Sequence, residues 1–72
     1  MHLTDALAIV EAGGRITSSS IPKGSVVKQV HNGWKPVVRV VFEATGDSYL
    51  FQNSNFDQSV DWREVEGWAS YD

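Results

Sequence analysis

The chain has no cysteine and only two histidines among its 72 residues. The lack of cysteine excludes disulfide bonds and thiolate zinc sites. His2 and His31 alone do not indicate a metal site, so we expect neither a metal nor another cofactor. No stretch approaches the roughly 20 apolar residues that a membrane-spanning helix needs. The first residues also lack the basic and apolar regions of a signal peptide. We therefore expect a cytoplasmic protein without membrane contact.

A chain of this length has room for one domain, spanning residues 1–72, with a small core. A domain this small buries only about 60% of the surface that its unfolded chain exposes. Small domains often gain stability from disulfides, metals or self-association. Because disulfides are excluded and no metal is expected, self-association remains. We therefore expect a homo-oligomer.

Acidic residues are missing from the middle of the chain. The net charge of −3 argues against general nucleic-acid binding. All nine carboxylates nevertheless lie outside residues 15–39, a segment with five basic side chains: Arg15, Lys23, Lys28, Lys35 and Arg39. One interpretation is a set of solvated strands followed by a solvated acidic tail. The other is a basic sheet face that binds a small anion or the acidic tail of a neighbouring subunit.

Asn32-Gly33 lies between two valine-rich runs, which is the pattern of a β-hairpin. It predicts a type I′ turn centred on these two residues, between strands at 26–31 and 34–44. Pro36 near the start of the second strand indicates a sheet edge, a bulge or an unpaired donor. Further strands are expected at 15–21, 48–52 and 60–65. The serines of the first of these indicate an edge strand or a loop, and the order of the residues after Val65 is not predicted.

The N-terminal segment predicts a helix of about two turns, because apolar residues recur at helical spacing. Thr4 is expected to cap its N-terminus, and Gly13-Gly14 is expected to end it. So short a helix does not form alone in water and has to lie on the sheet. The expected fold is α+β, with one short N-terminal helix packed on an antiparallel sheet of four to five strands.

No catalytic motif is evident. Asp57, Asp61 and Glu64 fall in an acidic tail, where carboxylates are usually exposed, and the three serines at 18–20 have no activating base. We do not expect an enzyme. Among the aromatic residues, Phe42, Phe51 and Trp62 are expected in the core.

Trp34 follows the predicted turn and is expected at the surface or at an interface. Near Lys28, Lys35 and Arg39, an exposed indole can stack on a base while the cations hold phosphates. It can equally form a subunit contact, because tryptophan and arginine are enriched at interfaces.

Both ends of the chain resemble a family of small phage proteins. Residues 51–65 (FQNSNFDQSVDWREV) resemble its closing motif, aromatic-x-Pro-Ser-x-x-Asp followed by Asp-Trp-x-x-Val, and residues 6–16 resemble its N-terminal helix. The family is that of the Thoeris anti-defence proteins of bacteriophages, some of whose relatives act as anti-CRISPR proteins. The matching motif positions are Phe51, Ser54, Asp57, Asp61 and Trp62.

The resemblance implies a small α+β domain that self-associates in the host cell cytoplasm and sequesters a cyclic ADP-ribose-type signal nucleotide without degrading it. The chain departs from the family pattern in three places. Asn53 replaces a proline, the gap between Asp57 and Asp61 is one residue short, and serines occupy 18–20 where the family tends to have arginine and then Gly-Trp.

These observations lead to one principal hypothesis, a phage counter-defence protein that binds a small signal nucleotide. Its candidate ligand-binding residues are Lys28, Trp34, Arg39, Ser54, Asp57 and Trp62. The first alternative is a protein-binding inhibitor of a host enzyme, acting through an exposed strand edge at 15–21 or through the acidic tail. The second is a structural phage component. Asp57 and Asp61 can also be structural, through side-chain to backbone hydrogen bonds.

Overall fold

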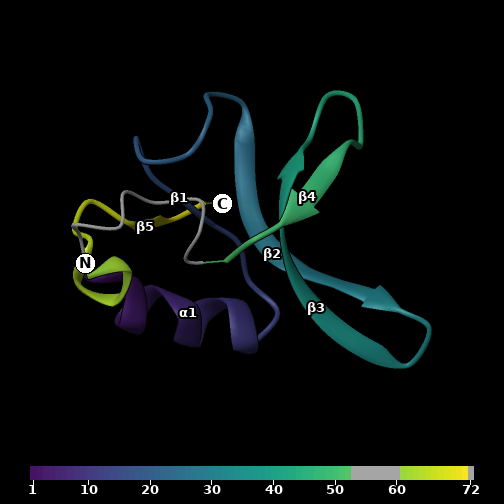
Figure 1. Ribbon diagram of the computed structural model, residues 1–72, viewed down its shortest axis with the longest axis horizontal. Coiled ribbons are helices and arrows are strands. Elements are labelled where there is room, and N and C mark those ends of the chain that lie inside the picture. The colour runs from purple at the N-terminus through teal and green to yellow at the C-terminus, as the bar shows by residue number, and fades with distance from the viewer. Residues whose placement is uncertain (53–60, 72) are drawn as a thin grey trace.

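A computed structural model describes residues 1–52 and 61–71 of the chain, with the side chain of Trp62 excepted. One helix lies against a five-stranded antiparallel sheet of order β4-β3-β2-β1-β5 (Figure 1). The predicted α+β fold is therefore confirmed. The elements are α1 (Leu3–Glu11), β1 (Ile16–Thr17), β2 (Ser25–Asn32), β3 (Lys35–Phe42), β4 (Ser48–Leu50), the 3₁₀ turn η2 (Trp62–Glu64) and β5 (Ala69–Ser70).

Helix α1 begins two residues earlier than its predicted cap would place it. His2 is the N-cap residue and makes no side-chain capping bond. Thr4 lies within the helix, where its hydroxyl donates to the carbonyl oxygen of Arg63 at 3.0 Å. The predicted capping role of Thr4 is therefore wrong, and the residue instead ties the helix to the C-terminal segment. The helix ends as predicted, at Gly13, which has a φ of +93°.

The central hairpin differs from its prediction by one residue. Asn32 pairs with Lys35, so the turn consists of Gly33 and Trp34. Gly33 has a φ of +67°, whereas no described non-glycine residue has a positive φ. Glycine at the first central position defines a type II′ turn, so the predicted type I′ turn on Asn32-Gly33 is wrong. The shift places Trp34 at the tip of the hairpin.

Pro36 marks an edge of this hairpin, as one of the alternatives predicted. The carbonyl oxygen of Val38 accepts the N–H of Phe51 at 3.2 Å, so even-numbered residues of β3 direct their backbone groups away from β2. Pro36 therefore lacks its N–H on the outer side of β3. Strand β4 pairs only with residues 39–41, so Pro36 removes no sheet hydrogen bond there.

Two of the other predicted strands are wrong in extent or type. Of the strand expected at 15–21 only β1 forms, and it is not an edge, because it pairs with β2 on one side and β5 on the other. The loop alternative is confirmed for the serines at 18–20. The hydroxyl of Ser18 instead accepts the N–H of Ser20 at 2.9 Å, a local bond that competes with strand pairing. In the described part of the segment 60–65, residues 62–64 form the 3₁₀ turn η2 instead of a strand. Residue 60 lies outside the described residues.

The core lies between α1 and one face of the sheet. Ile16, Val27 and Val40 are register partners on three adjacent strands, and all three are fully buried. Leu3, Ala6 and Val10 of the helix pack against them. This arrangement follows the pleat, because alternate residues of a strand share one face.

Among the described aromatic residues, Trp68 is the one that is fully buried in the core, with an exposed fraction of 2%. The ring of Phe51 meets it edge to face, with centroids 5.9 Å apart. Phe42 and Phe51 were both predicted in the core. Each is only partly buried, so this prediction is confirmed in part. The side chain of Trp62 lies outside the described residues. Trp68 belongs to the segment whose order the sequence did not predict.

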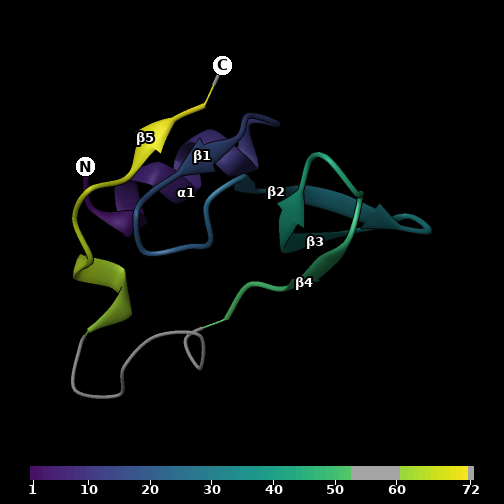
Figure 2. The same cartoon turned by 90° about the horizontal axis from the view of Figure 1, so that it is seen from above.

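The C-terminal segment is held beside the N-terminal helix. The N–H of Leu3 donates to the carbonyl oxygen of Val65 at 3.0 Å, and β5 pairs with β1. The β2–β3 hairpin projects on the opposite side of the molecule (Figure 2). No helix in the described ranges is long and apolar enough to cross a membrane.

Candidate anion-binding face of the sheet

The face of the sheet that points away from α1 carries a row of basic side chains. Lys28 and Arg39 are direct cross-strand partners on β2 and β3, and each is adjacent in sequence to a valine of the core face. The alternation of the pleat therefore places both cations on the other face, which we call the open face. Directly opposite residues of an antiparallel pair have Cβ atoms about 5 Å apart, so the two side chains start side by side. The guanidinium then turns toward Ser48 on β4, and the ammonium turns toward Glu43.

Arg39 is fixed by its neighbour on the outer strand. Its Nε donates to Ser48 Oγ at 2.8 Å, and its Nη2 donates to the carbonyl oxygen of Ser48 at 3.1 Å. No carboxylate is paired with Arg39 among the described residues. Two neutral acceptors orient the guanidinium without cancelling its charge, so the group retains its attraction for an anion.

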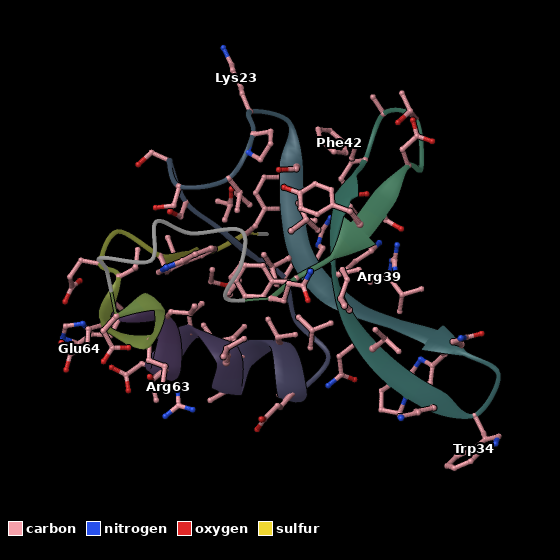
Figure 3. All side chains as sticks on the ribbon, in the orientation of Figure 1. Lys23, Trp34, Arg39, Phe42, Arg63 and Glu64 are labelled. Carbon is pink, nitrogen blue, oxygen red and sulfur yellow. The ribbon has the colours of Figure 1, made fainter. Side chains whose placement is uncertain are left out.

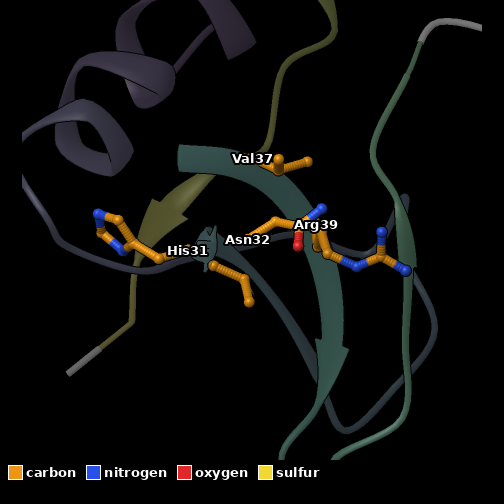
Figure 4. Close-up of a pocket in the computed structure, with 5 residues that line it drawn as sticks. His31, Asn32, Val37 and Arg39 are labelled. Carbon is orange, nitrogen blue, oxygen red and sulfur yellow. The ribbon is translucent and has the colours of Figure 1, made fainter. Parts of the chain in front are cut away.

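A shallow groove of about 310 Å³ lies beside Arg39 (Figure 4). Val30 and Val37 are register partners and give it an apolar wall. Arg39, Asn32 and His31 complete its lining. The groove thus combines a flat apolar surface with a guanidinium and an amide, which suits a ligand with a ring and a negative charge. Its volume is at the lower end of the roughly 300–1,000 Å³ typical of small-molecule sites.

Trp34 is at the surface, as predicted, with an exposed fraction of 91%. It lies at the tip of the hairpin, whereas Arg39 lies near its base (Figure 3). Arg39 is five positions along the chain from Trp34, which corresponds to about 16 Å at 3.3 Å per residue. The structure therefore pairs Lys28 with Arg39 on adjacent strands but does not place Trp34 beside them.

The remaining predicted site residues lie mostly outside the described part of the chain. This applies to Ser54, Asp57 and the side chain of Trp62. The structural role considered for Asp61 is confirmed, because its Oδ1 accepts the N–H of Arg63 at 3.2 Å. This bond caps the turn η2.

The structure shows a second cluster on the open face, in which two cations of the predicted basic segment meet Glu43 and Tyr71. The guanidinium of Arg15 lies over the ring of Tyr71, 4.9 Å from its centroid. Arg15 Nη1 also donates to Glu43 Oε1 at 3.0 Å, and Lys28 Nζ is 4.0 Å from the same oxygen. The sequence pointed to Arg15 as one of the basic residues in an acid-free segment. It gave no sign of Tyr71, because β5 and β1 are far apart in the chain and meet only in the folded sheet.

The chemistry that this face offers is electrostatic and hydrogen-bonding. Its cations supply N–H donors to an anion, and its valines supply apolar contact. In the part of the chain that the structure describes, histidine and acidic side chains form no cluster of three or more that could hold a metal ion.

Comparisons of the chain with protein-family models, with curated proteins and with solved structures find no match. The fold and the site therefore define its class by themselves. It is a small α+β domain with a helix on one face of its sheet and with basic side chains and a groove on the other.

Proposed function

We propose that this protein is a non-catalytic binding domain that holds a small nucleotide on the open face of its sheet. The observation that carries the proposal is the Arg39 guanidinium, which Ser48 orients beside the groove that Val30 and Val37 line. Lys28 is the cross-strand partner of Arg39 and adds a second positive charge to the same face. The two cations supply charge-assisted hydrogen bonds to phosphate oxygens. The valines supply an apolar surface for a base, and the Asn32 amide can donate to the edge of that base and accept from it.

The resemblance at the two ends of the chain supports a more specific version of this proposal. In that version the ligand is a cyclic ADP-ribose-type signal nucleotide, and the protein is a phage-type counter-defence protein that sequesters the signal. Sequestration requires tight binding and no chemistry. The nearly complete exposure of the Trp34 indole supports the homo-oligomer that this version includes, because large exposed aromatic side chains commonly bind a partner surface.

The test is calorimetric titration with a panel of cyclic nucleotides and cyclic ADP-ribose isomers. Arg39→Glu reverses a charge of the site and should abolish binding of any ligand that the wild-type protein binds. Lys23→Glu makes the same change of net charge on the Pro22–Gly24 turn and should retain binding. No heat with any compound, together with a monomeric mass in solution, would refute the proposal.

A second candidate function has its own supporting observation, the shape of the β2–β3 hairpin. In the described residues, β1 reaches β2 only at Val27 and β4 reaches β3 only at residues 39–41, so the outer half of the hairpin has no strand beside it. It carries Lys35 and the exposed Trp34 and no acidic residue. This arm suits an inhibitor that docks on a host protein with an acidic surface.

The two functions are separated by Trp34→Ala. If the protein acts through the hairpin tip, the variant loses capture of a host protein from lysate while nucleotide binding is unchanged. If the nucleotide proposal is correct, binding heat is lost with Arg39→Glu and kept with Trp34→Ala. If Trp34→Ala changes neither the capture of a host protein nor the binding of a nucleotide, the hairpin tip is excluded as a docking site.

A further inference from the structure

The cluster of Arg15, Lys28, Glu43 and Tyr71 has the composition of an anion site that already holds an anion. Glu43 follows the end of β3, and its Oε1 lies 3.0 Å from Arg15 Nη1 and 4.0 Å from Lys28 Nζ. One carboxylate oxygen thus faces two cations. The side chains are about one-third exposed, at 37% for Arg15 and Glu43 and 33% for Lys28, so solvent and solutes reach all three.

Arg15 is held in position from its other side. Its guanidinium lies 4.9 Å from the centroid of the Tyr71 ring, and the backbone N–H of Tyr71 donates to the carbonyl oxygen of Arg15 at 2.9 Å. The aromatic ring is therefore anchored to the residue that it supports. A guanidinium stacked on an aromatic ring keeps its N–H donors free at its edge, which is how arginine commonly presents itself to phosphate.

The carboxylate of Glu43 is a poor match for the two cations around it. An exposed ion pair contributes little to stability, because solvent screens it and the side chains lose rotational freedom. Here one oxygen of a single negative charge is shared, and Lys28 is at the limit of ion-pair distance. A phosphate carries more charge and three acceptor oxygens, so it can give each cation its own hydrogen bonds.

We propose that Arg15, Lys28 and Tyr71 form a phosphate-binding site that Glu43 closes in the unliganded protein, and that a phosphorylated ligand binds there by displacing the Glu43 carboxylate. Since Lys28 also neighbours Arg39, a ligand with two linked phosphates can extend from this site toward the groove. The identity of the biological ligand rests on the proposed function. The site itself does not, because any compound with adjacent phosphates tests it.

The probe is inorganic pyrophosphate, titrated calorimetrically at fixed low ionic strength into the wild-type protein and three variants. Glu43→Gln removes the internal competitor. If Glu43 closes the site in about nine of ten molecules, removing its charge raises the apparent affinity about tenfold. Arg15→Gln in the Glu43→Gln background should lose this gain, because the phosphate then lacks its principal partner.

Asp47→Asn is the matched control. It removes one negative charge from an exposed turn close to Glu43 in the sequence and changes the net charge equally. Its pyrophosphate affinity should stay within about twofold of the wild type, since screened surface charge acts weakly over distance. Equal gains in Glu43→Gln and Asp47→Asn, or no binding by Glu43→Gln, would overturn the inference.

The two proposals fail separately. If no nucleotide binds but Glu43→Gln binds pyrophosphate more tightly than Asp47→Asn, the phosphate site stands and the nucleotide function falls. If a nucleotide binds through Arg39 while Glu43→Gln has no effect on pyrophosphate or on that nucleotide, the Glu43–Arg15 contact is only a surface ion pair. Circular dichroism of the variants checks that each one is folded.

Discussion

Trp68 and Met1 hold the two ends of the described chain together through their main chains. The backbone N–H of Trp68 donates to the carbonyl oxygen of Met1 at 3.2 Å, and the amine of Met1 donates to the carbonyl oxygen of Trp68 at 2.9 Å. The indole of Trp68 enters the core between α1 and the sheet. The last described residues are therefore part of the folded unit.

Trp68→Ala should destabilise the protein severely, by about 3–5 kcal/mol, because it removes the largest buried side chain. A domain this small has a total stability of only about 5 kcal/mol, so this variant should retain at most about 2 kcal/mol and unfold at a much lower urea concentration. Trp68→Phe should cost less, about 1–2 kcal/mol, since the indole Nε1 has no hydrogen-bond partner in the described part of the chain. Urea unfolding followed by circular dichroism measures both. Equal losses in the two variants would contradict this account of the core.

The position of the hairpin turn predicts that alanine substitutions at two adjacent residues have unequal effects on stability. Gly33→Ala places a side chain at a φ of +67° and should cost about 1–2 kcal/mol. Asn32→Ala should change stability by less than about 0.5 kcal/mol, because Asn32 is a ladder residue opposite Lys35. A type I′ turn on Asn32-Gly33 would instead make Asn32→Ala costly as well. Thermal unfolding of the two variants distinguishes these turns.

The hydrogen bond of the Thr4 hydroxyl to the C-terminal segment predicts a modest contribution to stability. Thr4→Val preserves the shape of the side chain but loses the bond to the Arg63 carbonyl oxygen, which should cost about 1 kcal/mol. Thr4→Ser retains the hydroxyl and should stay close to the wild type. Hydrogen exchange provides a second measure, since loosening this contact should increase exchange in the turn η2. A loss confined to the first turn of α1 would indicate that Thr4 acts as a cap after all.

Substitution of Ser48 tests how strongly nucleotide binding depends on the orientation of Arg39. Ser48→Ala removes the acceptor at 2.8 Å from Arg39 Nε but leaves the bond to the Ser48 carbonyl oxygen. We expect nucleotide affinity to fall about threefold to tenfold, which corresponds to one lost hydrogen bond of about 1 kcal/mol, and to fall further with Arg39→Gln. Calorimetry of the two variants gives this order. Full wild-type affinity in Ser48→Ala would show that the carbonyl oxygen alone fixes the guanidinium.

The elements that could be predicted from the sequence depend on neighbouring residues. The glycines after Ala12 end α1 whatever the rest of the chain does, because a positive φ is a local requirement. The valine runs on both sides of Asn32 likewise predict two paired strands. The strand expected at 48–52 forms as β4, and its residues alternate as a strand should: Tyr49 and Phe51 pack on the core, and Leu50 is exposed.

The type of the hairpin turn was a local error of one residue, whereas the strand at 15–21 and the burial of Trp68 depend on distant residues. Serines 18–20 can pair as a strand or bond locally, and their bonding depends on where β5 and β2 lie. The burial of Trp68 depends on its main-chain bond to Met1 and on the bond between Leu3 and Val65, and no local pattern reveals those. The candidate site shows the same division. The Lys28–Arg39 pair follows from the hairpin register, whereas the contact of Arg15 with Tyr71 requires the sheet order.

Pro36 has a consequence for behaviour at high concentration. An exposed strand edge with valines on it invites the same strand of another molecule to add to it, which is a common route to aggregation. Pro36 offers no donor on the outer side of β3, and Lys35 beside it brings a charge that repels its own copy. The opposite side of the hairpin, along β2, has only Lys28 to oppose such stacking. Replacing Lys28 with an apolar residue should therefore lower the solubility of the protein more than the same change at Lys35.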